Sequence, residues 1–413
     1  MTERRVVVTG MGCVTPLGND LPTTWNNLVA GKNGIGPITK FDTTDFKAKL
    51  AAEVRDFDPK LYMEKPQILH SDLYAQLAMA AAVQAMEDSG IAGTVPGERM
   101  GVYIGTGIGG IQTFETEHSK LLNKGPRRVS AYFIPMMIAN IASSMIAIRY
   151  GCMGPAMPAV TACASGSIAI GEALRVVRHG YADAMICGGA EATVTPLAAA
   201  GFCNMQALST SEDPDAASLP FDARRGGFVM GEGSGVLILE EYEHAKARGA
   251  KIYGEICGYG STNDAYHITA PHPDGVGGAR AMADALREAG YTGDELVYVN
   301  AHGTGTHLND AIETMALKKA FGEELARKLL ISSTKSMTGH MLGAAGAVEA
   351  LFCAKALQEG YLPATINYQV PDPACDLDVV PNQGRSADVR YALSNSLGFG
   401  GHNGSLLFKK WEA

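Results

Sequence analysis

A cysteine among small residues is the first candidate for chemistry in this sequence. Residues 160–167 read V-T-A-C-A-S-G-S, and apolar residues then recur at helical spacing as far as a His-Gly stop at 179–180. This pattern predicts that Cys163 lies at or just before a helix N-terminus, where the helix dipole and free backbone N–H groups favour a thiolate. The alternative is a small buried cysteine that fills a strand–helix corner, the usual fate of an isolated cysteine.

Three polar clusters in the second half of the chain offer partners for this cysteine. Residues 300–306 read N-A-H-G-T-G-T directly after a buried-type strand, and ligands bind at the carboxyl ends of such strands. Residues 333–340 read S-T-K-S-M-T-G-H, and residues 397–404 form a glycine-rich turn, L-G-F-G-G-H-N-G. Taken singly, each cluster also fits a structural role, as a hydrogen-bonded histidine, a surface lysine or a hairpin. Neither histidine has a second ligand three or four residues away, so no metal site is expected.

Taken together, these residues resemble the condensing enzymes of fatty-acid synthesis, the beta-ketoacyl synthase family of the thiolase-like superfamily. The resemblance rests on Cys163, on His302 in A-H-G-T-G-T, on Lys335 and His340 in T-K-S-M-T-G-H, and on Phe399 in G-F-G-G-H-N. It covers the whole chain and is strongest for the elongating enzymes of the bacterial type II system. It implies an α/β fold with two duplicated halves in a five-layer α-β-α-β-α arrangement, usually as a homodimer.

The resemblance also implies a role for each matching residue. Cys163 corresponds to the acylated nucleophile, His302 and His340 to the two catalytic histidines, and Lys335 to the lysine that organises them. The backbone N–H groups of Phe399 and Cys163 would form an oxyanion hole. The resemblance also implies a structural supporting role for three acidic residues, Glu349, Asp310 and Glu313. Substrate contacts fall to Ile108, Phe133, Phe202, Thr304, Thr306 and Gly400, although ordinary core packing explains Phe133 and Phe202 about as well.

These residue types suit a decarboxylative condensation on thioesters. A thiolate attacks a carrier-bound acyl thioester, and two backbone N–H donors stabilise the tetrahedral oxyanion by roughly 3–4 kcal/mol each. Loss of CO2 from a malonyl thioester then leaves an enolate, which two imidazole N–H donors stabilise without a metal or an organic cofactor. The enolate carbon attacks the acyl-cysteine and gives a 3-oxoacyl product. The implied partner is therefore an acyl carrier protein, which delivers both the acyl and the malonyl group.

Two other functions on the same fold stay open at this point. A non-catalytic chain-length partner lacks the cysteine, so the presence of Cys163 with both histidines argues against it. A specialised polyketide or polyene ketosynthase keeps every catalytic residue, and only its acyl pocket and carrier surface would distinguish it.

The surface expected to meet an acidic carrier has few basic residues in this chain. Residues 64–70 read E-K-P-Q-I-L-H where relatives often carry several Lys or Arg, and Gln206 stands where they often have arginine. Gly305 also replaces a serine of many relatives, which should affect loop stiffness. The identity of the carrier is therefore less constrained than the reaction. The remaining basic candidates are Lys124, Arg127, Arg128, Arg224 and Arg225.

The elements that must position these residues predict two similar α/β halves. Strand patterns at 5–9, 100–104, 184–191 and 235–240 alternate with helix patterns, among them 21–31, 72–89 and 241–248. The pattern then begins again: 252–260 echoes 6–12, 296–305 echoes 100–107, and the helix that opens at 343 echoes the one that follows Cys163. We therefore expect a half at 1–250 with the cysteine and a half at 251–413 with the histidines.

A dinucleotide site has to be considered as well, because residues 105–110 read G-T-G-I-G-G after a strand pattern. That fingerprint requires an acidic residue roughly 20 residues further on, and residues 125–135 contain none. We interpret these glycines as a turn beside a pocket.

Composition excludes several other classes. The chain has 413 residues and a net charge of −9, so nucleic-acid binding is not expected to be its task. Its eight cysteines are scattered without a C-x-x-C pair, which argues against a zinc cluster and a disulfide framework. The sequence shows no secretory leader and no apolar run long enough to span a membrane. A reduced, cytoplasmic setting is therefore expected.

Overall fold

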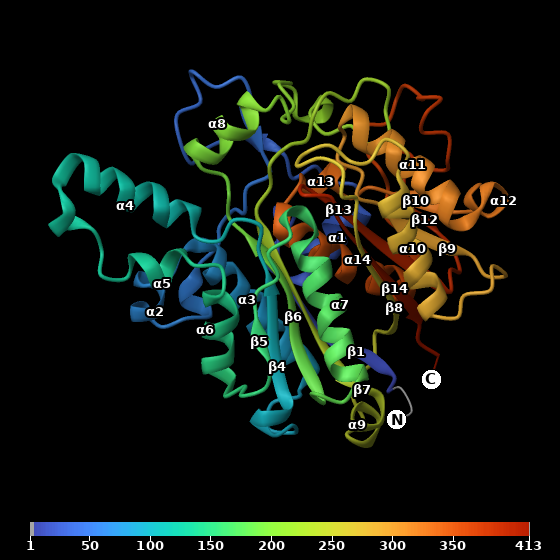
Figure 1. The fold of residues 1–413 in the computed structure, drawn as a ribbon, viewed down its shortest axis with the longest axis horizontal. Helices are drawn as coiled ribbons and strands as arrows, with labels where there is room; N and C mark the ends of the chain where they lie inside the picture. Colours follow the sequence, from blue (N-terminus) through green and yellow to red (C-terminus); the bar gives the residue numbers. More distant parts are fainter. Residues whose placement is uncertain (1–3, 413) are drawn as a thin grey trace.

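The computed structural model describes residues 4–412, which form a mixed ten-stranded sheet between layers of helices (Figure 1). Across the sheet the strands follow the order β10-β9-β13-β14-β8-β1-β7-β6-β4-β5. In the first half they are β1 (Val6–Val14), β4 (Met100–Gly105), β5 (Ala156–Met157), β6 (Ala184–Glu191) and β7 (Gly233–Glu241). In the second half they are β8 (Gly254–Asn263), β9 (Val297–Asn300), β10 (Leu330–Ser332), β13 (Tyr391–Gly398) and β14 (His402–Lys410).

The two halves of the sheet share one strand order. Read from its outer edge inward, each half places its third, second, fourth, fifth and first strand side by side. The halves meet where β1 and β8 pair over two residues, with Val7 opposite Glu255 and Val8 opposite Gly254. The duplicated α/β fold predicted from the sequence is therefore confirmed. The division at residue 250 stays our proposal, and it falls in the connection between β7 and β8.

Helices cover both outer faces and fill the space between the halves, as the five-layer arrangement requires (Figure 1). On the outer face of the first half, α3 (Leu73–Ser89) packs against β1, β7 and β6. On the outer face of the second half, α10 (Val276–Glu288) packs against β8 and β14 beside α11 (His307–Phe321). The central layer consists of α7 (Ser165–Arg178) from the first half and α14 (Ala345–Glu359) from the second, in mutual contact.

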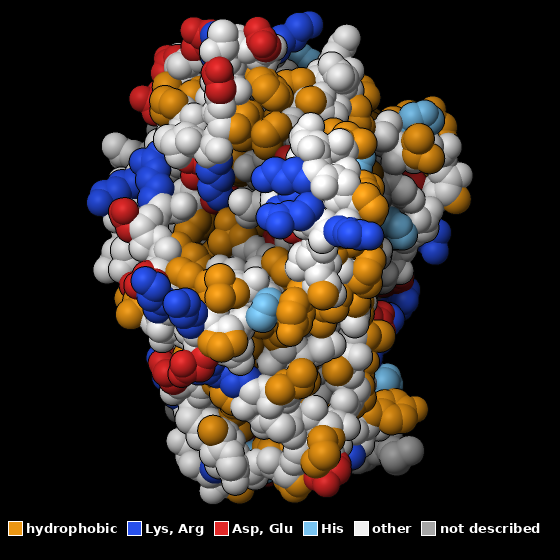
Figure 2. Space-filling view, turned by 90° about the vertical axis from the view of Figure 1, so that its left-hand side faces the viewer, with side chains coloured by type: hydrophobic (Ala, Val, Ile, Leu, Met, Phe, Trp, Pro, Cys, Tyr) orange, Lys and Arg blue, Asp and Glu red, His pale blue; other side chains and the backbone are white. Residues whose placement is uncertain are grey.

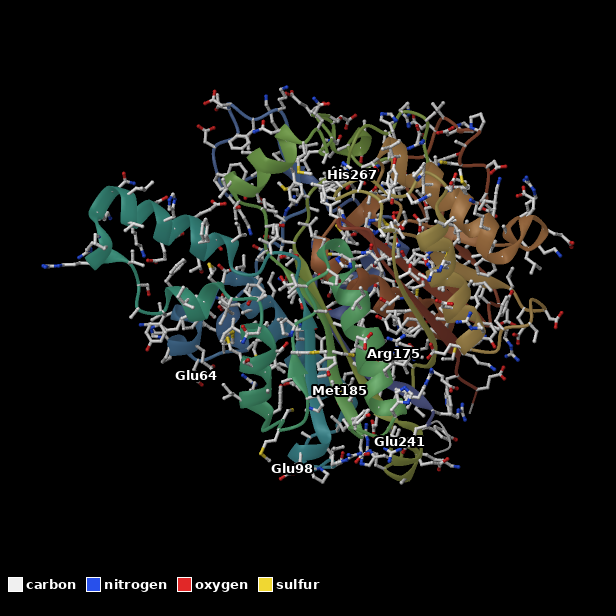
Figure 3. The ribbon with its side chains drawn as sticks, viewed as in Figure 1. Glu64, Glu98, Arg175, Met185, Glu241 and His267 are labelled. Atoms are coloured by element: carbon white, nitrogen blue, oxygen red, sulfur yellow. The ribbon has the colours of Figure 1, made fainter. Side chains whose placement is uncertain are left out.

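Alternate residues of each central strand belong to different cores. In β6, Met185 and Cys187 join the central core, and Met185 is labelled beside α7 in Figure 3. Ala184 and Ile186 of the same strand join the core under α3. Strands buried on both faces favour continuous apolar sequences, which is why these segments show no alternation of polar and apolar residues.

Glycines explain why the echo between residues 6–12 and 252–260 exists. A Cβ at Gly12 would overlap the carbonyl oxygen of Ala81 in α3, and a Cβ at Gly260 would overlap that of Ala281 in α10. Each half thus uses a glycine to bring its outer helix onto its first strand. The predicted end of the first strand at residue 9 was wrong, because β1 continues through Gly10 and Gly12 to Val14.

The remaining helices connect and cover this framework. Residues 111–150, where no helix was predicted, form the arm at the left of Figure 1. The arm comprises α4 (Ile111–Lys124), α5 (Phe133–Met137) and α6 (Ile141–Tyr150). Elsewhere lie α1 (Leu21–Val29), α2 (Lys65–Leu69), α8 (Pro196–Asn204), α9 (Tyr242–Ala247), α12 (Glu323–Ala326) and α13 (Lys335–Thr338). Two small antiparallel strand pairs complete the fold: β2 (Gly36–Pro37) with β3 (Leu50–Ala51), and β11 (Tyr361–Leu362) with β12 (Arg385–Ser386).

Gly260→Ala should lower the free energy of unfolding by about 3 kcal/mol, because the added methyl meets a backbone carbonyl that cannot move aside. Gly201→Ala in α8 is the matched control, since nothing lies within 4 Å of its Cβ position. It should be neutral or stabilise by up to about 1 kcal/mol. Chemical denaturation of the two variants measures the difference, and equal stabilities would contradict the close approach of α10 to β8.

Candidate active site

Cys163 lies in a sharp turn that the fold braces from several sides. The residue belongs to a single 3-10 turn, Ala162–Ala164, directly before α7, as predicted. Ala162 has φ of 51°, a left-handed conformation that a residue with a side chain adopts at a cost. The Ser165 hydroxyl accepts a hydrogen bond from the Thr161 N–H at 2.9 Å and donates to the Ala162 carbonyl at 2.6 Å. The turn therefore presents Cys163 as a fixed elbow with 8% of its surface exposed.

The second half contains an equivalent elbow without a cysteine. Leu342 has φ of 45° and begins the 3-10 turn Leu342–Ala344, which leads into α14. Gly343 follows Leu342 as Cys163 follows Ala162, so it takes the cysteine's place in this half. The two elbows are close neighbours, because a Cβ at Gly166 would lie 2.8 Å from the Ala347 nitrogen.

The two histidines lie together in the second half. His302 follows β9, His340 follows α13, and their rings are 5.2 Å apart at an angle of 86°. Each is 2% exposed, and the Nδ1 atom of each lacks a hydrogen-bond partner among the described residues. Burial, followed by the charge of Lys335, lowers the pKa of both imidazoles well below the usual range. Both rings are therefore neutral at pH 7, and each can present one N–H as a donor.

Two buried carboxylates of α11 fix the turn that carries His302. Glu313 accepts hydrogen bonds from the backbone N–H groups of His302 and Gly303, both at 2.8 Å. Asp310 accepts from the Gly305 N–H at 3.2 Å. Gly305 has φ of 76°, so a glycine suits this position better than a residue with a side chain. The contacts of these two carboxylates support the bracing role that we propose for them.

Lys335 forms a buried ion pair behind the histidines. Its Nζ lies 2.5 Å from Oε1 of Glu349, and each side chain is 1% exposed. Burial raises the pKa of Glu349 to about 7, although Lys335 opposes the shift. The lysine charge also lowers the pKa values of Cys163, His302 and His340. It thus acts on all three groups without lining the cavity.

The Cys163 thiol is protonated in the resting structure. Burial, aided by the negative charge of Glu191, raises its pKa to about 12, against the charge of Lys335 and the backbone N–H groups of Phe399 and Cys163, which lower it. The sequence led us to expect a stabilised thiolate at the start of a helix. The cost of placing a charge in this dry elbow outweighs that effect.

The glycine-rich turn at 398–401 connects β13 and β14, so the predicted hairpin exists, and it also touches the elbow. A Cβ at Gly398 would lie 2.8 Å from the Thr161 oxygen and 3.2 Å from the Cys163 nitrogen. The N–H groups of Phe399 and Cys163 both act on the Cys163 sulfur. They therefore have the placement that a two-donor oxyanion hole next to the nucleophile requires.

A cavity of about 500 Å³ joins these groups. Of the residues proposed from the sequence, it is lined by Cys163, His302, His340, Phe399, Ile108, Phe202, Thr304 and Thr306. Its lining also includes Gly107, so the glycine run at 105–110 is a turn beside a pocket, as interpreted above. Lys335, Gly400 and Phe133 are not part of the lining. Phe133 instead begins α5, with its ring 6.5 Å from that of Phe114.

Several other residues that line the cavity were not predicted from the sequence. Leu342 could have been found as the equivalent of Ala162, and Asn403 as part of the glycine-rich turn at 397–404. Leu308 lies two residues after the cluster at 300–306, whereas Asp264 and Met205 lie in segments without a recognisable pattern. Asp264 belongs to a loop at the cavity mouth that also carries His267, labelled near the top of Figure 3. This loop is bonded to the glycine turn through Asp264 N–H to the Gly401 oxygen and Gly400 N–H to the Ile268 oxygen.

Residues 4–412 contain neither a metal-binding cluster nor a membrane-spanning helix. No group of three or more histidine, cysteine, aspartate or glutamate side chains is arranged to bind a metal ion there. None of the helices described has both the length and the apolar character to cross a membrane.

Comparisons with known proteins agree with this geometry. The family model for the beta-ketoacyl synthase N-terminal domain matches residues 3–245, and the model for its C-terminal domain matches residues 253–369. A 3-oxoacyl-[acyl-carrier-protein] synthase 2 of Synechocystis sp. is 52% identical over 100% of this chain and 99% of its own length. The enzyme of the same name from Staphylococcus aureus strain COL is 50% identical over the same shares of the two chains.

Solved structures of ketosynthases share the fold over nearly the whole chain. A beta-ketoacyl synthase from Burkholderia phymatum is 36% identical with a TM-score of 0.92, covering 99% of this chain and 100% of its own. A type II polyketide ketosynthase solved with its acyl-carrier protein and a hexaketide is 37% identical with a TM-score of 0.90, with the same coverage.

Alkylation of Cys163 by iodoacetamide should accelerate with pH without reaching a plateau between about pH 6 and pH 10. The thiolate reacts, and a pKa raised to about 12 keeps its population growing about tenfold per pH unit across that range. Peptide mass analysis of timed samples gives the rate at this cysteine, with partly exposed Cys203 as an internal comparison. A plateau near neutral pH would show instead that the helix N-terminus outweighs burial.

Proposed function

The chain belongs to the beta-ketoacyl synthase family, and from that membership we propose that it is a 3-oxoacyl-[acyl-carrier-protein] synthase, an acyltransferase that lengthens an acyl chain by two carbons. One observation carries the proposal: a single cavity brings a cysteine elbow from one half together with two neutral histidines from the other. A thiol beside two N–H donors suits acyl transfer followed by condensation.

In the first step, Cys163 accepts the acyl group from the carrier. Its sulfur forms a bond to the thioester carbon, the bond from that carbon to the carrier sulfur breaks, and the thiol proton leaves with the carrier thiol. Because the resting thiol is protonated, proton removal must accompany the attack. The N–H groups of Cys163 and Phe399 stabilise the oxyanion, and the charge of Lys335 favours loss of the proton.

In the second step, a malonyl thioester binds in the same cavity and loses CO2. The electron pair of the broken carbon–carbon bond moves into an enolate, whose oxygen becomes negatively charged. His302 and His340 both line this cavity, and each neutral ring has one N–H that can donate to the enolate oxygen without taking up a further proton. The enolate carbon then attacks the acyl-cysteine carbonyl, and the released Cys163 takes up a proton. A malonyl thioester supplies the carbanion itself, so we propose that no organic cofactor takes part.

We place the enzyme in fatty-acid synthesis. It is 50–52% identical to curated 3-oxoacyl-[acyl-carrier-protein] synthases, compared with 37% to the type II polyketide ketosynthase. A specialised ketosynthase is the second candidate, supported by the TM-score of 0.93 to the ishigamide ketosynthase and chain length factor. Cys163 argues against a non-catalytic chain-length partner. We propose the cytoplasm as its location, where its eight unpaired cysteines would stay reduced.

The carrier surface that we propose lies beyond the end of α4. Arg127 and Arg128 are exposed there, and neither forms an ion pair within residues 4–412. Two earlier candidates suit docking less well, because Arg225 is buried against Asp372 and Arg224 is already paired with Asp222. Figure 2 views the side of the molecule that carries this arm and shows Lys and Arg side chains gathered near an apolar hollow. An acidic carrier would find unpaired positive charge at this site on an otherwise acidic protein.

We propose a homodimer formed along β5. This strand is the edge of the sheet, and its residues Ala156 and Met157 are both exposed. Exposed apolar side chains flank it along the chain, including Met153 at 67% and Val160 at 53%. The opposite edge is partly covered, since the Ile331 N–H donates to the Asp378 oxygen. An open edge beside apolar surface favours pairing with a second copy.

His302→Ala and His340→Ala should still form the acyl-cysteine but release CO2 from malonyl-carrier roughly a hundredfold more slowly. Each change removes one donor to the enolate, worth about 2–4 kcal/mol, and leaves the oxyanion hole intact. Intact-mass analysis follows the adduct, and labelled malonyl-carrier follows CO2 in the same preparations. Cys163→Ser is the control, which should form no adduct. Wild-type rates of CO2 release in both histidine variants would contradict the enolate role.

Arg127→Glu combined with Arg128→Glu should raise KM for acyl-carrier about tenfold and reduce its dependence on salt. Reaction with a short acyl-pantetheine should stay within about twofold of wild type, because the cavity lies elsewhere. The matched control is Arg224→Gln, whose arginine is already engaged by Asp222. Equal losses with both substrates would mean that the arginines act on the fold and not on docking.

A further inference from the structure

A buried carboxylate that the proposed mechanism does not use lies at the end of β6. Glu191 is fully buried and accepts four hydrogen bonds. Its Oε2 accepts from the backbone N–H groups of Gly107 at 2.7 Å and Gly343 at 2.9 Å. Its Oε1 accepts from the Thr106 hydroxyl at 3.0 Å and the Ile108 N–H at 3.3 Å. One side chain therefore links a turn of the first half to the elbow of the second.

The junction leaves no space for another group. A Cβ at Gly343 would overlap the Gly107 nitrogen and lie 2.7 Å from Oε2 of Glu191, while a Cβ at Gly107 would lie 2.8 Å from the same oxygen. Burial raises the pKa of Glu191 to about 7, although its four donors oppose the shift. Burying a carboxylate costs solvation free energy. Glu191 must therefore have a role that an apolar side chain could not fill, namely accepting hydrogen bonds from both turns.

What Glu191 positions is part of the cavity wall. Ile108 lines the cavity and is 41% exposed, so packing alone does not fix its side chain. The turn that carries it is bonded on its outer side through the Gly110 N–H to the Met137 oxygen at 3.0 Å. Glu191 provides the inner attachment of the same turn. Leu342, adjacent to Gly343, lines the cavity as well.

We propose that Glu191 is a positioning residue for acyl-chain selection, which sets how far the Ile108 and Leu342 wall can retreat from an incoming chain. This inference rests on the proposed function, since it assumes that an acyl chain occupies the cavity. Glu191 does not line the cavity, so it acts through the two residues it anchors.

Glu191→Gln is the first test. A glutamine oxygen can still accept from Gly107 and Gly343, but its NH2 group then faces the Ile108 N–H, donor against donor. The Ile108 turn should loosen while Cys163 and the histidines stay in place. Across a ladder of acyl-carriers, the ratio of kcat/KM between the best and the poorest chain length should fall about tenfold. The lost Glu191 charge also acts on the Cys163 thiol, but this effect should be the same at every chain length and leave the ratio unchanged.

Thr106→Val is the second variant and leaves the carboxylate intact. It removes the hydroxyl that donates to Glu191 and accepts from the Gly109 N–H at 3.1 Å. The same flattening of chain-length preference, to a smaller extent, is expected. Because valine has nearly the shape of threonine, this variant keeps the test available if Glu191→Gln folds poorly.

Glu240→Gln is the matched control. Glu240 is as buried as Glu191 and lies at the other end of the β6–β7 strand pair. Glu191 in β6 is opposite Gly233, whereas Glu240 in β7 is opposite Ala184. Its neighbour Glu241 marks that lower edge in Figure 3, far from the cavity mouth marked by His267. Loss of its bonds to Arg248 and Thr9 should lower the melting temperature without changing the chain-length preference.

A double-mutant cycle separates positioning from general loosening. If Glu191 acts through Ile108, Glu191→Gln should change the chain-length ratio much less in the Ile108→Ala variant than in the wild-type protein. Uniform losses at all chain lengths, additive effects with Ile108→Ala, or an equal change in Glu240→Gln would overturn the inference. The proposed function fails separately, if wild-type protein forms no acyl-cysteine and no 3-oxoacyl product.

Discussion

The close contact between the N-terminal ends of α7 and α14 is the constraint on which the rest of the structure depends. Gly166 lies against the backbone of Ala347, and a Cβ at Gly346 would overlap the Ser167 hydroxyl. These two glycines bring the elbows of both halves together at the centre of the molecule. Only then can a cysteine from the first half face histidines from the second within one cavity. The outer helices depend on the same device, since glycines in β1 and β8 let α3 and α10 approach.

The dry centre that this packing creates determines the protonation of every catalytic group. Burial raises the pKa of Cys163 and lowers the pKa values of His302 and His340, so all three are neutral at rest. Lys335 is the charged exception, and the fold supplies Glu349 beside it. An unpaired buried charge would cost several kcal/mol, whereas the pair keeps a positive charge near the places where negative charge develops. The chemistry thus uses neutral donors for the enolate and one compensated cation for the thiol.

Much of this could be predicted from the sequence, because the relevant signals are local. The elbow before a helix, the three polar clusters and the repeat of strand patterns each occupy a short window. Other features depend on contacts that no window contains. The glycines at 10 and 12 suggested the end of a strand, but they lie within a continuous strand and face α3. Burial, and not the position at a helix N-terminus, determines the pKa of the Cys163 thiol. From the sequence, Glu191 is only the last residue of a strand. Its bracing role cannot be predicted locally, because its hydrogen-bond donors lie far away in the chain, at residues 106–108 and 343.

The duplication also explains why the protein has one nucleophile and not two. The elbow of the first half faces the His302 turn of the second, and the elbow of the second faces the residue 106–109 turn of the first. In the first junction a cysteine opens into the cavity, and Glu313 braces the opposing turn from behind. In the second junction Gly343 takes the cysteine's place, where any side chain would meet Gly107 and Glu191. Carboxylates brace both junctions, but at the second the carboxylate lies between the elbow and the turn and fills the space that a substrate would need. The junction at Cys163 is therefore open to a substrate. The equivalent junction at Gly343 is closed, and it holds part of the wall of the substrate cavity.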